Sequence, residues 1–282
     1  MLRRWTLDEI EFIKNNYLTI GAAACGKVLN RTATAIHHKT EKLKIIHVKR
    51  KVEQMLFTEI RDCKIAYWLG LMWADGYIVD YSIGLSLAKK DMDEISSIMT
   101  DFGDWKEYIR HPQNPNHKIV SMFRIGDTFL RNFLIENDYK TKSTVSPTKI
   151  LSKIPNELHN YFWRGFFDGD GCIFIHTKGN YNHGVITLAG SYRQDWSDFE
   201  KLLEQLQIKY KLKRIIGVKG HKCSKVTISN KKDLKHFCEY IYKNTEQANI
   251  GFTRKYIKYK KFLEVENFRI ASTNRIDTDV CN

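Results

Sequence analysis

The sequence predicts an α+β fold with two pseudo-symmetric α-β-β-α-β-β-α repeats, preceded by a small three-helix domain of the helix-turn-helix type. An apolar helix that ends at a glycine occurs twice, over residues 66–78 and 160–173. Pairs of strand-like segments follow each copy, separated by amphipathic helices, and such pairs without a βαβ alternation favour antiparallel sheets. The first fifty residues show helical periodicity alone.

The N-terminal helices begin at a capping box formed by Thr6 and Glu9. An alanine-rich second helix is expected over residues 21–29, and a turn at residues 30–32 leads into a third helix that ends near Lys42. A tight turn before the last of three short helices is typical of a helix-turn-helix. A three-helix protein-interaction module is the alternative.

The repeats are expected to alternate strands and helices in the same order. In the first repeat, the expected strands lie near 82–88, 105–110 and 118–125, with helices near 92–101 and 128–136. In the second repeat, the strands lie near 172–176, 185–189, 211–218 and 224–229, with helices near 196–206 and 232–242. The predicted segments are a helix-turn-helix domain at 1–47, a basic linker at 48–60, repeats at 61–150 and 151–265, and a tail at 266–282.

The charge balance favours a polyanionic partner. The net charge is +14 and the pI is about 9.4, so nucleic acid is expected before an anionic membrane. No apolar run approaches 18 residues and the N-terminus lacks the apolar core of a signal peptide, so we expect no membrane association. The six cysteines form no CxxC pair. They indicate an intracellular protein, either cytoplasmic (bacterial or phage-encoded) or organellar.

Small residues four apart mark one face of each motif helix, at Gly70 and Ala74 and at Gly165 and Gly169. Residues at i and i+4 share a face, so two such helices can pack closely around a pseudo-two-fold axis. Their C-terminal ends would then lie side by side.

Two carboxylates, Asp75 and Asp170, stand at those helix ends. A helix C-terminus disfavours a carboxylate by roughly 0.3–1 kcal/mol, and a divalent cation would remove this conflict. We expect Mg²⁺ (or Mn²⁺) to be held by Asp75, Asp170 and the main chain at Ala74 and Gly169. Turn chemistry at Asp-Gly is the alternative. A calcium EF-hand is excluded because its twelfth position is Gly179.

The two motifs, Gly70–Gly76 and Gly165–Gly171, resemble those of the LAGLIDADG homing endonucleases with two motifs per chain. The first copy has Trp73 where the second has Asp168, a position that we interpret as packing or helix capping. The resemblance covers about residues 60–265. It implies a DNA saddle, a monomeric pseudo-dimer, double-stranded DNA as partner, and metal-assisted double-strand cleavage of a long asymmetric target. It implies catalytic roles for Asp75 and Asp170.

The resemblance also implies a basic residue near each cleavage centre. We assign this role to Lys142 and Lys255, with Lys140 and Arg254 as adjacent alternatives. Such a lysine would stabilise developing charge or position the attacking water.

Basic and polar side chains on the predicted strands, their loops and the third N-terminal helix are the expected DNA contacts. These are Arg31, Thr34, His37, His38, Lys42, Tyr108, Arg110, Lys118, Arg124, His176, Lys178, Thr187, Arg193, Lys213, Arg214 and Lys225.

Two other functions fit the same fold. One is an RNA maturase that assists intron splicing, and the other is a non-catalytic DNA-binding regulator. The presence of both Asp75 and Asp170 favours the nuclease over the regulator, and the predicted helix-turn-helix favours DNA over RNA.

Overall fold

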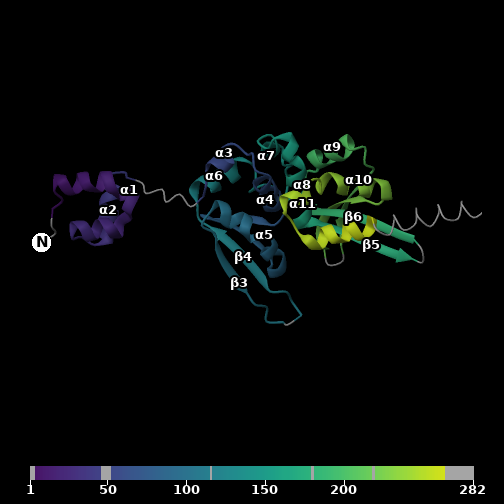
Figure 1. The fold of residues 1–282 in the computed structure, drawn as a ribbon, viewed down its shortest axis with the longest axis horizontal. Helices are drawn as coiled ribbons and strands as arrows, with labels where there is room; N and C mark the ends of the chain where they lie inside the picture. Colours follow the sequence, from purple (N-terminus) through teal and green to yellow (C-terminus); the bar gives the residue numbers. More distant parts are fainter. Residues whose placement is uncertain (1–3, 46–51, 115, 179–180, 218–219, 264–282) are drawn as a thin grey trace, which may run out of the picture. The chain divides into compact units, whose positions relative to one another are not determined.

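The computed structural model describes residues 4–45, 52–114, 116–178, 181–217 and 220–263 (Figure 1). The chain divides into two compact units, Met1–Arg50 and Lys51–Asn282. Residues 48–51 of the expected linker (48–60) and the whole expected tail (266–282) lie outside the described residues. No helix among the described residues is both long enough and apolar enough to cross a bilayer.

The first unit contains two helices among its described residues, α1 (Leu7–Leu29) and α2 (Ala33–Lys42). The expected break before residue 21 is therefore wrong, because one continuous helix replaces the first two predicted helices. The alanines at 22–24 have the highest helix propensity and offset the cost of Gly21, so the helix continues through this segment. The helix ends instead at Asn30, which has a left-handed backbone (φ 50°). The capping box of Thr6 and Glu9 is confirmed.

A small apolar core joins α1 to α2. Ile13, Tyr17 and Cys25 from α1 pack with Ile36 from α2, and all four are buried. This core is separate from that of the second unit.

The second unit contains two repeats with the same order of elements, as the sequence predicts. The first repeat holds α3 (Met55–Thr58), α4 (Cys63–Ala74), β1 (Gly76–Val79), β2 (Ser82–Ala88), α5 (Lys89–Phe102), β3 (Lys106–Arg110), β4 (Val120–Ile125) and α6 (Thr128–Glu136). The short helix α7 (Thr148–Leu151) follows. The second repeat holds η1 (Asn156–Leu158), α8 (His159–Asp170), β5 (Gly171–Lys178), β6 (Tyr181–Ser191), α9 (Ser197–Gln205), β7 (Lys211–Ile216), β8 (Lys222–Ile228), α10 (Lys231–Ile241) and α11 (Thr245–Ala248). Residues 253–263 form a further helix.

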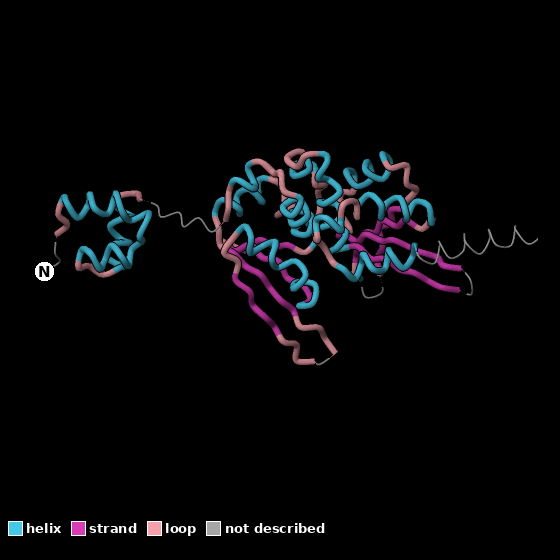
Figure 2. Tube along the Cα trace, in the orientation of Figure 1, coloured by secondary structure: helices cyan, strands magenta, loops and turns pink. Residues whose placement is uncertain are grey.

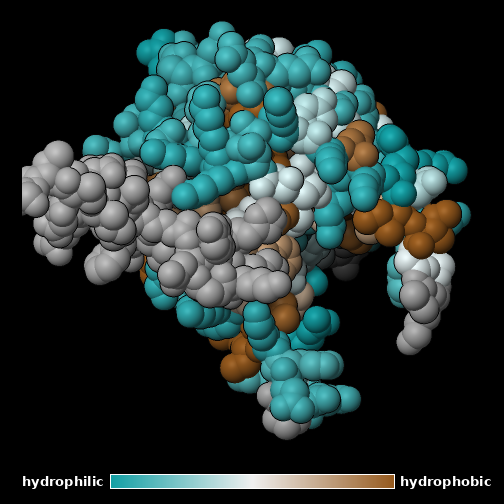
Figure 3. All heavy atoms as spheres, turned by 90° about the vertical axis from the view of Figure 1, so that its right-hand side faces the viewer, coloured by the Kyte–Doolittle hydropathy of each residue, from teal (hydrophilic) through white to brown (hydrophobic). Residues whose placement is uncertain are grey.

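The strands form two antiparallel four-stranded sheets with equivalent topology. Their orders are β1-β2-β4-β3 and β5-β6-β8-β7. Within this unit the helices cover one face of the sheets (Figure 2). Seen from the side of the second repeat, the surface over the helices is mainly hydrophilic (Figure 3). The opposite faces of the sheets are consequently the ones not covered by helices.

The close packing of the two motif helices is confirmed. A Cβ at Gly70 would overlap the carbonyl oxygen of Phe162, and a Cβ at Gly165 would overlap that of Tyr67. The backbones of α4 and α8 therefore touch where the sequence places glycine. One continuous apolar core surrounds this contact and includes both repeats.

Candidate metal centre and nucleic-acid interface

The C-terminal ends of α4 and α8 bring Asp75 and Asp170 to one place. Asp75 is the C-cap of α4, and Asp170 is the last residue of α8. A Cβ at Gly169 would overlap the Ala74 side chain and lie 2.8 Å from Asp75 Oδ2. Because residue 169 has no side chain, the end of α8 can lie directly against the Asp75 carboxylate.

Both carboxyl groups have raised pKa values, mainly because they are buried. Burial raises the pKa of Asp75, and the ammonium groups of Lys142 and Lys255 oppose this shift. Burial followed by the charge of Asp75 raises the pKa of Asp170 to about 6, against the same two ammonium groups. A pair of crowded carboxylates that resists ionisation is an environment that a cation would stabilise.

Each helix end is capped by a lysine from a distant part of the chain. Lys142 Nζ donates to the carbonyl oxygens of Met72 (2.8 Å), Ala74 (2.8 Å) and Gly76 (2.6 Å). An ammonium at a helix C-terminus satisfies otherwise unpaired carbonyls and opposes the negative end of the helix dipole.

Lys255 has the equivalent position in the second repeat. Its Nζ donates to the carbonyl oxygens of Phe167 (2.7 Å), Asp168 (2.6 Å) and Gly171. Burial lowers the pKa of both Lys142 and Lys255 to about 8.

The structure distinguishes these lysines from their sequence neighbours. Lys140 is exposed. Arg254 donates to both carboxylate oxygens of Asp91 on α5, at 2.7 and 2.9 Å. Arg254 therefore ties the two repeats together, whereas Lys142 and Lys255 lie at the helix ends.

The oxygen donors at this centre fit a hard divalent cation. Asp75 and Asp170 would supply carboxylate oxygens, which Mg²⁺ prefers, with water and phosphate completing the coordination. The carbonyl of Ala74, which we expected as a ligand, already accepts a hydrogen bond from Lys142. Among the described residues there is no cluster of three or more His, Cys, Asp or Glu that could hold a metal. With Asp75 and Asp170 as ligands, coordination positions would remain open for water and phosphate.

Asp168 has a structural role that differs from the role of Trp73. The Asp168 side chain is fully buried, and its Oδ2 accepts from Tyr67 Oη (3.0 Å) and from the backbone N–H of Phe252 (2.9 Å). Asp168 thus fixes the start of the helix that carries Lys255. In the first repeat, Trp73 instead packs edge-to-face on Tyr139, whose hydroxyl donates to the Leu69 carbonyl.

The uncovered face of the first sheet carries three of the expected contacts. Tyr108 and Arg110 on β3 and Arg124 on β4 are exposed. Lys118 is also exposed, but it lies in the loop before β4 rather than on a strand. Lys106, which pairs with Arg124 across the ladder, was not among the expected contacts.

The second sheet places the expected contacts less uniformly. Thr187, Lys213 and Lys225 lie on the uncovered face, although Thr187 is buried. Arg214 is correctly on β7, but strand alternation turns it to the opposite face, where it donates to the Tyr192 and Gln194 carbonyls. Arg193 is exposed in the loop after β6. The side chains of His176 and Lys178 lie outside the described part of the structure.

The alternation of side chains along the strands would have added two residues to the expected DNA contacts and removed one from them. Lys211 occupies the same face as Lys213, two residues away, just as Lys106 does relative to Tyr108. The period-two rule applied to β7 would have included Lys211 and left out Arg214.

In the first unit, the expected contacts divide into exposed and internally bonded side chains. Thr34, His38 and Lys42 are exposed on α2. His37 is also exposed, but its Nδ1 lies 3.1 Å from Tyr17 Oη. Arg31 forms a paired ion bridge with Glu9 (3.0 and 2.9 Å) and stacks on the Trp5 ring at 3.9 Å. Arg31 therefore serves packing within the unit in this structure.

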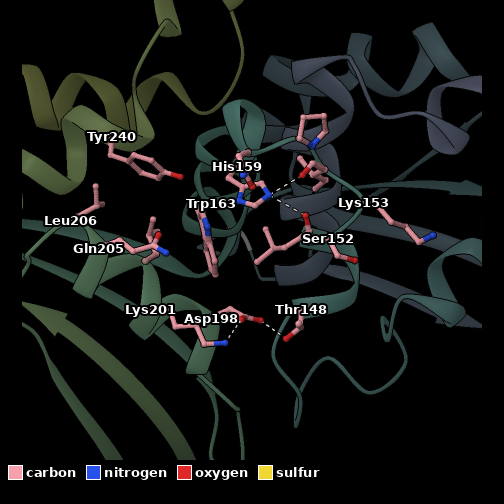
Figure 4. A pocket seen from close by; sticks show the side chains of 15 residues that line it. Thr148, Ser152, Lys153, His159, Trp163, Asp198, Lys201, Gln205, Leu206 and Tyr240 are labelled. Atoms are coloured by element: carbon pink, nitrogen blue, oxygen red, sulfur yellow. Dashed lines mark hydrogen bonds and ion pairs between the residues drawn. The ribbon is translucent and has the colours of Figure 1, made fainter.

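A cavity of about 890 Å³ opens on the helical side of the second unit (Figure 4). Several of its polar side chains have partners within the protein. His159 Nε2 lies within 3.0 Å of the Leu151 and Ile154 carbonyls, and Asp198 is bonded to Thr148 and Lys201. The carboxylates at the helix ends do not line this cavity, so it is separate from the candidate centre.

Comparisons with known proteins find one family-model match, which lies in the second repeat. Residues 157–242 match the family model described as a LAGLIDADG-like domain. An uncharacterized protein of Methanocaldococcus jannaschii is 25% identical over 153 residues, which are 52% of this chain and 55% of that protein. The chain thus spans about half the length of this relative.

The chain is also similar to solved structures of DNA-bound endonucleases. The meganuclease I-SmaMI bound to uncleaveable DNA matches at 15% identity and a TM-score of 0.47, over 70% of this chain and 88% of that one. I-WcaI bound to its recognition sequence matches at 14% identity and a TM-score of 0.47, over 71% and 91%. I-GzeII with its DNA target matches at 11% identity and a TM-score of 0.42, over 77% and 93%.

Proposed function

Because this chain carries a LAGLIDADG-like domain at residues 157–242 and a first repeat of the same topology, we propose that it is a homing endonuclease. Its substrate is double-stranded DNA with a long asymmetric target, and its product is a double-strand break. The chain acts as a monomer, because both motifs are present in it.

One observation carries this proposal: two half-buried carboxylates, the half-buried Lys142 and the buried Lys255 lie at the paired ends of α4 and α8. A structural turn needs neither the second carboxylate nor the lysine caps. Each repeat contributes one carboxylate and one lysine, so the centre has one such pair for each of the two strands of a duplex.

Each side chain has a distinct task in hydrolysis. Asp75 and Asp170 would hold Mg²⁺ or Mn²⁺, and the metal would supply Lewis-acid chemistry for the phosphate and for water. Lys142 and Lys255 hold the helix-end carbonyls in place. They also put positive charge beside the phosphates, where negative charge develops in the transition state.

Changing Asp170 to Asn tests the proposal directly. We expect Asp170→Asn to abolish double-strand cleavage while DNA binding stays within a few-fold of wild type, since the substitution removes a metal-binding charge outside the sheets. The substrate is a plasmid that carries the uninterrupted insertion site of the coding gene, incubated with Mg²⁺. Linear product is measured on gels, and binding by electrophoretic shift in EDTA.

The matched control is Glu157→Gln, an equal carboxylate-to-amide change at an exposed position beside the helical-side cavity. It should cleave like wild type. Linear product from Asp170→Asn would refute the assignment of the centre. Binding by wild type without any cleavage would support a regulator, and binding of intron RNA without DNA cleavage would support a maturase.

A further inference from the structure

On the uncovered face of each sheet, one row of cross-strand paired residues starts two positions after the aspartate of the motif helix. The two rows occupy equivalent positions in the two repeats. In the first sheet the row is Tyr77, Gly84, Arg124 and Lys106. In the second sheet it is Cys172, Thr187, Thr227 and Lys211. Tyr77 and Cys172 each follow the metal-centre aspartate by two residues. The two rows therefore lie at corresponding places but have different chemistry.

Arg124 is held in one orientation by its neighbours. Its Nε donates to Tyr77 Oη at 2.9 Å. The guanidinium carbon lies 5.9 Å from the Tyr77 ring centroid and 5.6 Å from that of Tyr108. A weak contact of 3.8 Å joins its Nη2 to Met122 Sδ. Both rings are within the range of cation–π attraction.

Gly84 makes this arrangement possible. Gly84 lies on β2 between Tyr77 on β1 and Arg124 on β4. A Cβ at position 84 would overlap the Tyr77 ring and its hydroxyl. Without a side chain there, the tyrosine lies across the strand and reaches the arginine. Thr187 occupies the equivalent position in the second sheet and leaves no such space.

Arg124 bonds to Tyr77 through Nε, so the terminal nitrogens of its guanidinium group remain available to bind a base. Arg124 is exposed and has no carboxylate partner among the described residues. A free arginine loses much rotational freedom when it binds, whereas a clamped one loses less. Arg124 is on an inner strand of its sheet. Side chains at such positions would face base edges in the major groove, while loop residues reach phosphates.

We propose that Arg124 reads a guanine close to the cleavage centre, in the half of the target that faces the first sheet, and that Tyr77 positions it. Two terminal guanidinium nitrogens match the O6 and N7 acceptors of guanine. The second sheet has Thr227 at the equivalent position, and a threonine side chain has no guanidinium group to bind guanine in this way. This inference rests on the proposed DNA binding but not on cleavage.

Selection of binding sites from a randomised duplex library tests this proposal. The full-length protein is used in EDTA, so that cleavage does not remove ligands. Wild type should enrich sites with a fixed guanine on one side of the centre. Arg124→Ala should lose that preference, on the order of tenfold or more, with other positions unchanged. Tyr77→Phe keeps the ring but removes the hydroxyl, and should weaken the same preference.

The matched control is Lys106→Ala, a neighbour in the same row. It should lower affinity for all sequences and leave the guanine preference intact, and thermal unfolding checks that each variant is folded. Retention of every guanine preference by Arg124→Ala overturns the inference while leaving the nuclease proposal standing. Absence of any enriched sequence with wild type overturns both.

Discussion

Asp170 and its neighbours show how charge is arranged at the residue level. A carboxyl group with a pKa of about 6 lies beside Asp75 and two ammonium groups with pKa values of about 8. All of these shifts are dominated by burial, which disfavours each charged form. The folded protein without metal therefore carries an electrostatic cost at this centre.

This cost predicts a pH-dependent effect of Asp170→Asn on stability. The pKa of Asp170 is about 6 in the folded protein, above its ordinary value of 3.8. Between these pH values the folded state holds the proton more tightly than the unfolded state, so the free energy of unfolding falls as pH rises from 4 to 6 and then levels. In EDTA at pH 7, Asp170→Asn should be more stable than wild type, by up to about 3 kcal/mol.

Urea unfolding at pH 4 and pH 7 measures this difference. The two proteins should differ little in urea midpoint at pH 4, which lies below the folded pKa of Asp170 and near its ordinary value of 3.8. Mg²⁺ should raise the midpoint of wild type at pH 7 and leave the variant unchanged. A variant that is less stable than wild type at pH 7 would contradict this account.

The two lysines predict strand-specific defects. Lys142→Met and Lys255→Met each remove one helix-end ammonium and its three hydrogen bonds to carbonyls. Each variant should cut one strand roughly 10²-fold more slowly than the other, so that nicked plasmid accumulates. Labelling the two strands separately should show opposite strands affected. Lys140→Met, at an exposed neighbour, should behave as wild type; equal slowing of both strands would argue against separate centres.

At the level of elements, the repeats and sheets could be predicted because their signals are local. Alternation, amphipathic periods and the two motif helices define both sheets and the α4–α8 contact. The alanine-rich part of α1 misled the prediction, since its propensity continues the helix where a break was expected. Lys142 could only be assigned by resemblance, because it reaches carbonyls 66–70 residues away in sequence. The hydrogen bonds of Asp168 depend on the same kind of distant contact.

The contact of α4 with α8 predicts a severe effect of a single methyl group. Gly165→Ala would place a Cβ against the Tyr67 carbonyl oxygen, which belongs to backbone and cannot rotate away. We expect a loss of about 1–3 kcal/mol in the free energy of unfolding. Gly126→Ala is the control, because its nearest neighbour would lie 3.5 Å away. Thermal unfolding compares them, and an unchanged Gly165→Ala would mean that the helices are not in backbone contact.

For the whole molecule, the charge of +14 determines how DNA binding responds to salt. Exposed lysines and arginines on both sheets would displace counterions from phosphates. If the protein neutralises six to ten phosphates, its affinity should fall by about 10³–10⁵-fold between 50 and 200 mM salt. Fluorescence anisotropy with a labelled duplex measures the slope. A slope near zero would contradict a phosphate-dominated interface.

The glycine contact between α4 and α8 has a consequence for partial denaturation. The two repeats share one apolar core. Each carboxylate lies at the end of a motif helix that packs against the motif helix of the other repeat. Melting of either half would therefore disrupt both proposed cleavage sites together. Heat-treated enzyme should lose nicking and double-strand activity in parallel, and would not survive as a single-strand cutter.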